Sequence, residues 1–410
     1  MMMNNKRSLF FSMDFLLPAI LCLYTASLYF SNRTVVCATF LLVASGAALI
    51  IYRTGCGKQK LSRPHLLVYG CLAVYAVRAV WLLFGDNLQN GLRWVDTGLP
   101  FILFPLLFQY LPWNERMLKT VLLFFVRFTG LFCIITLFSV AWHSFQLPVS
   151  IKEWLLYPKS YPFAYTWTNY DHPSFLCVIY LLALPVSLYL KRRYRAISTI
   201  EIITLIVIET ATLAFTGARV GFIILPVLLL WMLLYRISFK RKIMTIGLPV
   251  ALAGGTVIGL LGWDNQFTSR FEDPVRIQLW KTAMASIKEK PLLGTGTGGM
   301  DAVLASPEIA GALGYTEPLP LSYPHNQYLG EIMHFGFIGA AALFGTLAYL
   351  LVLAFRKKDF LLQSLLFILF VFMFTEMPLD SHKGINFFLF FISLFVATIP
   401  LRTDAGVKTQ

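Results

Sequence analysis

Two arginines have the type and position that best suit chemistry on an anion in this chain of 410 residues. Arg219 lies between glycines in residues 216–221, at the mouth of an apolar run, and Arg276 begins a stretch with helical spacing. A guanidinium keeps its charge and presents a planar fork of N–H donors that matches phosphate oxygens. The ordinary alternatives are an arginine that reaches the membrane interface for Arg219 and a solvated helix face for Arg276. We interpret the pair as a candidate anion site, with Arg270 as a weaker candidate of the same kind.

His325 lies directly before another apolar run, in the order Tyr-Pro-His-Asn-Gln-Tyr over residues 323–328. A histidine side chain takes up or releases a proton near neutral pH, which suits a general base. The neighbouring Asn326 could fix the imidazole ring or hold a sugar hydroxyl. Because a lone histidine more often has a structural role, His325 is a catalytic candidate only together with the arginines.

A glycine-rich segment, residues 294–299, follows Pro291. The backbone N–H groups of Gly294 and Gly296 could cradle a phosphate. The segment lacks the Lys-Ser or Lys-Thr ending of a nucleotide-binding P-loop. A tight turn that closes the preceding helix is therefore the interpretation that the pattern alone favours.

Other polar residues occur where they need an explanation. Arg78 and Arg127 fall inside apolar runs, where a charge is costly unless it is paired or faces a polar cavity. Glu376, Asp380 and His382 occur together late in the chain, as either a polar rim or a solvated turn, and we favour the turn. The segments that we place on the outer side of the membrane, by the argument below, contain no zinc signature, Ser-x-x-Lys, nucleotide fingerprint or Asp-x-Asp pair. We therefore expect arginine-based chemistry without a metal or a cofactor.

The elements that position these residues belong to a membrane protein. Hydrophobic residues make up 58% of the chain and charged residues 13%, against about a quarter charged in a soluble domain. Apolar runs of about 20 residues recur, and each is long enough to cross a bilayer. We predict an all-α, polytopic integral membrane protein, a single domain over 1–410 with about twelve transmembrane helices. The predicted spans are 14–31, 35–52, 66–84, 97–111, 119–142, 172–190, 200–215, 219–236, 244–262, 328–355, 360–375 and 385–401.

The basic residues predict the orientation. The net charge is +14, and most lysines and arginines fall on one side of the predicted spans. The positive-inside rule then places both termini in the cytoplasm, and it accounts for the charge without a nucleic-acid partner. Residues 1–7, which are short and basic, predict an uncleaved first helix rather than a signal peptide.

Two outer segments are too long to be simple connections. Residues 143–171 are rich in Tyr, Trp and Pro, and residues 264–328 form the larger loop. Apolar residues recur every four positions over 273–290, which predicts an amphipathic helix on the membrane surface. The six cysteines show neither zinc spacing nor a disulfide framework. The candidate residues therefore collect at the outer mouth, as arginines with one nearby histidine.

The order of these motifs resembles the O-antigen ligase and polymerase superfamily of bacterial inner membranes. The resemblance rests on Arg219-x-Gly, Arg276-x-x-x-Trp280, a Pro-Leu-Leu-Gly-x-Gly segment over 291–296, and His325-Asn326-x-Tyr328-Leu. It covers about 200–345, whereas the N-terminal half matches only in being hydrophobic. The four motifs in order carry the resemblance, because each one alone is weak.

The resemblance implies a membrane-embedded glycosyltransferase of the GT-C type, with its active site on the periplasmic face. It implies a donor glycan on undecaprenyl pyrophosphate, a lipid A–core acceptor, and metal-independent transfer with inversion. Arg219 and Arg276 would hold the pyrophosphate, and His325 would be a general base or a further pyrophosphate contact. The residues expected to bind substrate are Arg270, Trp280, Asn326, Tyr328, Gly294 and Gly296.

Two other functions share part of this pattern. A polymerase that extends the lipid-linked repeat chain would carry the same motifs, and the compact set of Arg219, Arg276 and His325 favours the ligase. A transporter of the lipid-linked glycan would also fit twelve spans and buried arginines. Carriers often show paired halves with matching broken helices, and the sequence shows no such symmetry. A purely structural membrane partner would explain none of the clustered motifs.

Overall fold

The computed structural model describes residues 16–57, 62–146, 173–216, 219–235, 274–305 and 323–403, and every regular element in these ranges is helical. Within them, six helices are long and apolar enough to cross a membrane. They are Asn32–Gly55, Leu66–Phe84, Leu88–Tyr110, Glu115–Ser139, Ser174–Tyr194 and Gln327–Arg356. Shorter apolar helices cover Leu16–Ser27, Val220–Leu233, Phe360–Met373 and His382–Ala397. The prediction of an all-α polytopic membrane protein is confirmed.

The predicted spans can be compared with these helices one by one. Each predicted span coincides with helical residues except 244–262, which lies outside the described residues. Most of the aromatic loop 143–171 also lies outside them, as do residues 264–273 and 306–322 of the larger loop. Most of the fourth predicted span, 97–111, is an apolar helix that contains Pro105, and Gly98 and Leu99 separate it from a short polar helix that ends at Thr97.

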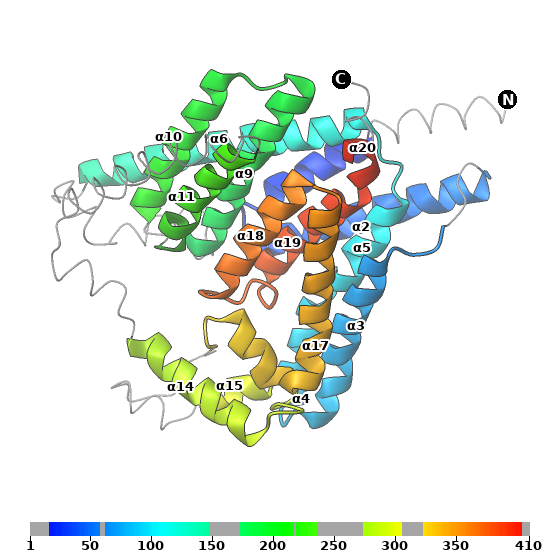
Figure 1. Ribbon diagram of the computed structural model, residues 1–410, viewed down its shortest axis with the longest axis vertical. Coiled ribbons are helices and arrows are strands. Elements are labelled where there is room, and N and C mark those ends of the chain that lie inside the picture. Colours follow the sequence, from blue (N-terminus) through cyan, green and yellow to red (C-terminus); the bar gives the residue numbers. More distant parts are fainter. Residues whose placement is uncertain are drawn as a thin grey trace.

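The helices pack around α9 (Pro173–Tyr194) and α19 (His382–Ala397), as Figure 1 shows. The neighbours of α9 are α6 (Glu115–Gln146), α10 (Thr199–Thr216), α11 (Arg219–Leu234) and α18 (Phe360–Met373). The neighbours of α19 include α18, α5 (Pro100–Tyr110) and α2 (Asn32–Gly55). Gly221 of α11 permits a close helix approach, because a Cβ there would lie 2.7 Å from the Cys177 Sγ of α9.

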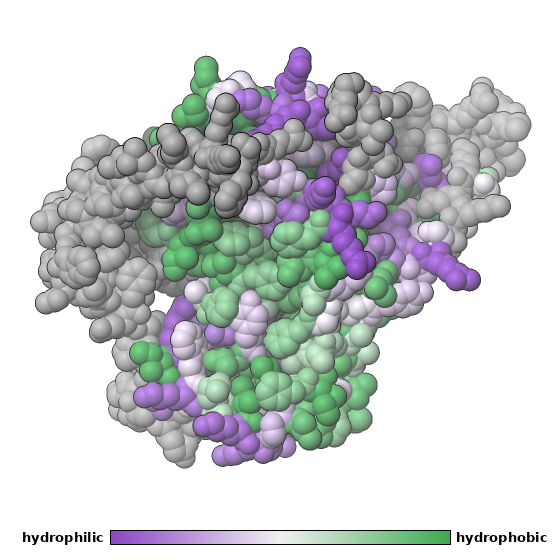
Figure 2. All heavy atoms as spheres, in the orientation of Figure 1, coloured by the Kyte–Doolittle hydropathy of each residue, from purple (hydrophilic) through white to green (hydrophobic). Residues whose placement is uncertain are grey.

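A smaller group of helices forms one end of the molecule, at the bottom of Figure 1. It comprises α4 (Leu88–Thr97), α14 (Pro274–Glu289) and α15 (Gly299–Leu304), beside η1 (Trp81–Phe84) and the first part of α17 (Gln327–Arg356). The short helix α20 (Ile399–Thr403) lies at the opposite end. Figure 2 shows hydrophobic residues over the middle of this face and hydrophilic residues towards both ends, as expected for a chain that crosses a membrane.

The helix α17 is interrupted at Gly336, whose φ of +61° is left-handed. A Cβ at this position would lie 2.1 Å from the Leu292 backbone oxygen, so only glycine fits. The N–H groups of Phe337 and Ile338 donate to the carbonyls of Pro291 and Leu292, at 2.8 and 3.3 Å. Carbonyl groups of the loop thus accept the hydrogen bonds of N–H groups that α17 leaves without helical partners at the break. Backbone groups of a helix in a membrane require such partners.

The same loop also donates to α17. The N–H groups of Thr295 and Gly296 donate to the carbonyl oxygens of Met333 and His334, both at 2.9 Å. This two-way exchange fixes the glycine-rich turn in the break of α17. The end of α14 is thereby held against the helix that follows His325 in the chain.

The predicted amphipathic helix is α14, which begins at Pro274 and ends before Pro291. Its regularly spaced residues Leu279, Ala283 and Ile287 are buried. They join a cluster with Met300, Leu304, Met333 and Met377. The apolar stripe of α14 therefore packs on the protein itself, which fixes the direction in which Arg276 and Trp280 point.

Candidate functional site

A buried carboxylate joins the two residues that the sequence singled out in the larger loop. Glu376 Oε1 accepts from Arg276 Nη2 at 3.2 Å, and Glu376 Oε2 lies 3.0 Å from His325 Nδ1. Glu376 is 1% exposed, whereas the side chains of Arg276 and His325 are about a quarter exposed. The three residues form what we call the Arg-Glu-His cluster.

The spacing of Arg276 and Trp280 explains how α14 contributes to this cluster. Residues four apart lie on the same face of a helix. Arg276 Nη1 also donates to the Thr375 carbonyl at 2.7 Å, and Trp280 Nε1 donates to the Pro324 carbonyl at 2.6 Å. One face of α14 therefore binds both the loop that carries Glu376 and the turn that carries His325.

The backbone before α17 directs the His325 side chain. His325 has a φ of +48°, a left-handed conformation that costs energy for a residue with a Cβ. Asn326 caps α17, since its side-chain oxygen accepts from the Leu329 N–H at 3.1 Å. The ring of Tyr323 lies 4.3 Å from the imidazole, centroid to centroid. A capped helix start and an aromatic neighbour thus hold the imidazole towards Glu376.

Arg78 of α3 (Leu66–Val80) holds the loop that carries Glu376 in place. The Arg78 side chain is completely buried. Arg78 Nη2 donates to Asp380 Oδ1 at 2.5 Å and to the Leu379 carbonyl at 3.2 Å. Glu331 of α17 lies 3.9 Å from the same nitrogen. The arginine in a predicted span is therefore paired, and its partners position residues 376–380.

Gln327 connects this network to α17. Its Nε2 donates to Asp380 Oδ2 at 2.6 Å and to Glu331 Oε2 at 3.2 Å, while its Oε1 accepts from the Leu379 N–H at 3.0 Å. Gln327 follows the His325 turn by two residues. The two loops of the cluster are thus fixed to each other by a buried set of hydrogen bonds.

Several residues expected to bind substrate have other contacts. The N–H groups of Gly294 and Gly296 donate to the carbonyls of Lys290 and His334, so the structure assigns both glycines to the turn. Tyr328 donates its hydroxyl to the Phe370 carbonyl at 3.0 Å and packs on Phe374, between α17 and α18. These three residues do not join the Arg-Glu-His cluster.

The structure does not describe the side chains of the other two candidate arginines, Arg219 and Arg270. Arg219 is the first residue of α11, and only its backbone is described. Arg270 lies outside the described residues. The roles expected for them remain predictions.

Sequence reasoning assigned Glu376 to a solvated turn, and its burial contradicts that interpretation. The signal that could have found it is its position, in the short segment between two apolar runs on the same predicted side as Arg276 and His325. The other arginine in a predicted span, Arg127, pairs with Glu201 at 3.4 Å, and both side chains are about half exposed. It takes no part in the cluster.

The geometry allows one proton transfer and one anion contact. An ionised carboxylate only accepts hydrogen bonds, so Glu376 places the imidazole proton on Nδ1 of a neutral His325. The basic nitrogen is then Nε2, and a protonated ring would be stabilised by the same carboxylate. Arg276 has five N–H donors, and its partly exposed guanidinium can still contact an anion from solvent.

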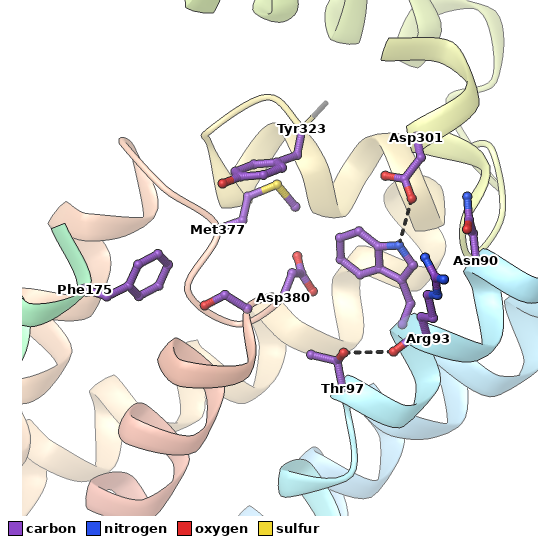
Figure 3. A pocket seen from close by; sticks show the side chains of 10 residues that line it. Asn90, Arg93, Thr97, Phe175, Asp301, Tyr323, Met377 and Asp380 are labelled. Carbon is purple, nitrogen blue, oxygen red and sulfur yellow. Dashed lines mark hydrogen bonds between the residues drawn. The ribbon is translucent and has the colours of Figure 1, made fainter. Parts of the chain in front are cut away.

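A cavity of about 280 Å³ adjoins the cluster, between α4, α15 and the loop after α18 (Figure 3). Two of its lining residues are close in sequence to the cluster. Tyr323 precedes His325 by two positions, and Met377 directly follows Glu376. In the described ranges no group of three or more His, Cys, Asp or Glu side chains could hold a metal ion.

Comparison with known proteins adds two matches. Residues 202–344 match the family model described as O-antigen ligase. An uncharacterized protein of Haemophilus influenzae is 27% identical over 183 residues, which are 40% of this chain and 44% of the relative. The chain thus spans less than half of that relative's length. The family match contains Arg276 and His325, whereas Glu376 lies beyond its end.

Proposed function

We propose, from the match of residues 202–344 to the O-antigen ligase family model, that the chain is a glycosyltransferase that acts as the ligase. It transfers a glycan from undecaprenyl pyrophosphate to a sugar of lipid A–core. The reaction takes place at the periplasmic face of the bacterial inner membrane, with both termini in the cytoplasm. The Arg-Glu-His cluster is the observation that carries this proposal.

Arg276 would contact the pyrophosphate of the donor. As the bond between the anomeric carbon and the pyrophosphate oxygen breaks, negative charge grows on the leaving group. A guanidinium held in place before the reaction stabilises that charge without reorganisation. Arg276 is held in this way by Glu376 and the Thr375 carbonyl. Arg219, at the start of α11, is the second proposed contact.

His325 would accept the proton of the acceptor hydroxyl at Nε2. The hydroxyl oxygen attacks the anomeric carbon from the side opposite the pyrophosphate, so a single displacement inverts the configuration. Glu376 orients the ring and stabilises the imidazolium that forms. The residue that positions the base also positions Arg276, so deprotonation and departure of the leaving group are geometrically linked.

The test is a lipopolysaccharide gel of a strain from which this gene is deleted, with a strain that makes only one repeat as the control. If the protein is the ligase, the ladder of long chains disappears and full-length lipid-linked polymer accumulates. If core with a single repeat remains, the protein is a polymerase. An unchanged gel excludes both functions and favours another acceptor.

A further inference from the structure

The cavity beside the Arg-Glu-His cluster has its own chemistry. Its walls come from α4, from α15, from the start of α9 and from the two loops that carry His325 and Glu376. Figure 3 shows the labelled side chains around it, with Asp301 and Asn90 on one side and Phe175 on the other. The lining residues are Asn90, Arg93, Trp94, Thr97, Phe175, Asp301, Tyr323, Met377, Asp380 and Ser381.

An aromatic ring and a carboxylate are held next to each other in this wall. Trp94 is half-buried, and its Nε1 donates to Asp301 Oδ2 at 3.4 Å. The indole also packs on the ring of His334 in a T-shaped arrangement, with 4.4 Å between the ring centroids. Burial raises the pKa of the Asp301 carboxyl, and nearby Asp380 adds to the effect. The indole face and the second Asp301 oxygen are therefore placed before any ligand arrives.

The charges in the cavity balance. Asp380 is paired with buried Arg78, and Asp301 lies within the field of exposed Arg93. A phosphate would meet two carboxylates here and no excess of positive charge, so it gains nothing on entering. An uncharged molecule with many hydroxyls suits the cavity better, because its hydroxyls can donate to Asp301 and Asn90 while its apolar face covers the indole.

The size and position of the cavity restrict the class of ligand further. The volume of about 280 Å³ lies just below the range for ligand pockets, roughly 300 to 1,000 Å³, which suits one sugar ring rather than a chain. Tyr323 lines the cavity and also packs on His325. A ring bound here therefore lies next to the residue that packs on the proposed base.

We infer that this cavity is a subsite for one uncharged sugar ring of the acceptor, with Trp94 as the stacking surface and Asp301 as the hydroxyl acceptor. This inference rests on the proposed ligase function. The subsite would hold the acceptor so that one hydroxyl reaches His325. Specificity would follow from hydroxyl positions, because a site built to bind a hydroxyl rejects a ring that lacks it.

The test uses the full chain in detergent with lipid-linked glycan as donor and rough lipopolysaccharide as acceptor. Trp94→Ala should raise the KM for the acceptor about tenfold or more and leave the KM for the donor within twofold. Asp301→Asn keeps the shape of the side chain and should also raise the acceptor KM. Trp94→Phe keeps the ring but loses the N–H, and should fall between Trp94→Ala and the wild type. Leu92→Ala, an exposed position on the same helix, is the matched control.

A binding measurement separates this inference from the proposed function. Saturation-transfer NMR with methyl glycosides of glucose, galactose and N-acetylglucosamine should show binding to the wild type and to Leu92→Ala but not to Trp94→Ala. Binding that needs Trp94, without any transfer to rough lipopolysaccharide, would uphold the subsite and refute the ligase. Transfer with unchanged acceptor KM in both Trp94→Ala and Asp301→Asn would refute the subsite alone. Displacement of the glycoside from this cavity by inorganic pyrophosphate would also refute it.

Discussion

Replacing Glu376 with glutamine tests the Arg-Glu-His cluster most directly. Glutamine has the same shape, so the buried position stays filled, but the negative charge that faces Arg276 and His325 is lost. One end of the amide then presents N–H donors to a group that also donates. We expect the imidazole to lose its fixed orientation and its partner for the protonated state.

The size of the effect follows from the contacts. A hydrogen bond to a charged group contributes about 1.5 to 3 kcal/mol, and both partners of Glu376 are about a quarter exposed, which favours the lower value. Two such bonds give about 3 kcal/mol. If this energy is lost in the transition state, kcat falls on the order of 100-fold, since about 1.4 kcal/mol corresponds to tenfold.

The assay is transfer from lipid-linked glycan to rough lipopolysaccharide, with thermal melting of the same preparations to detect loss of folding. Glu115→Gln is the matched control, because Glu115 also accepts hydrogen bonds from an arginine and a hydroxyl, Arg193 and Tyr194. It belongs to α6, outside the cluster, and should keep the wild-type kcat. A folded Glu376→Gln protein with a kcat within threefold of the wild type would refute the proposed role of the cluster.

Further predictions concern other residues of the cluster and its supports. Arg276→Ala should abolish transfer while the protein remains in the membrane, and Arg276→Lys should also be severe because an ammonium cannot bind two oxygens in a fork; near-normal transfer by either would exclude the pyrophosphate contact. Arg219→Ala should have the same effect, measured in the same assay. Gly336→Ala should lower the melting temperature or the yield sharply, because the added Cβ would lie 2.1 Å from a backbone oxygen; an unchanged melting curve would show that the break in α17 can relax. Arg78→Met should destabilise the protein by about 3 to 5 kcal/mol, since it leaves Asp380 buried without its charge partner, and stability equal to the wild type would contradict that pairing.

Much of the fold could be predicted because hydrophobicity and proline act locally. The predicted helix 273–290 and the observed α14 differ by one residue at each end, since Pro274 starts the helix and Pro291 prevents its continuation. The same local logic missed the break in α17. Gly336 lies in an apolar run, and its left-handed backbone depends on a loop about forty residues earlier in the chain.

The site could be predicted only in part, because its assembly depends on contacts that are distant in sequence. Arg276 and His325 carry recognisable chemistry, but their common partner Glu376 is 100 and 51 residues away from them. A carboxylate in a short polar segment has no local pattern that distinguishes a buried bridge from a solvated turn. Trp94 was missed for a similar reason, since only the packing of α4 beside α15 places its indole against Asp301.

The long separation within the Arg78 pair has a consequence for biosynthesis. Asp380 follows Arg78 by 302 residues, so the third predicted span is synthesised long before its charge partner exists. An unpaired arginine raises the cost of membrane insertion, by about 2.5 to 3.5 kcal/mol at a helix centre and by less towards a helix end, and Arg78 lies in the last turn of α3. We expect α3 to remain beside water or the insertion machinery until the end of the chain emerges. Completion of the C-terminal helices would then act as a checkpoint, because a chain that stops before Asp380 leaves Arg78 without this charge partner.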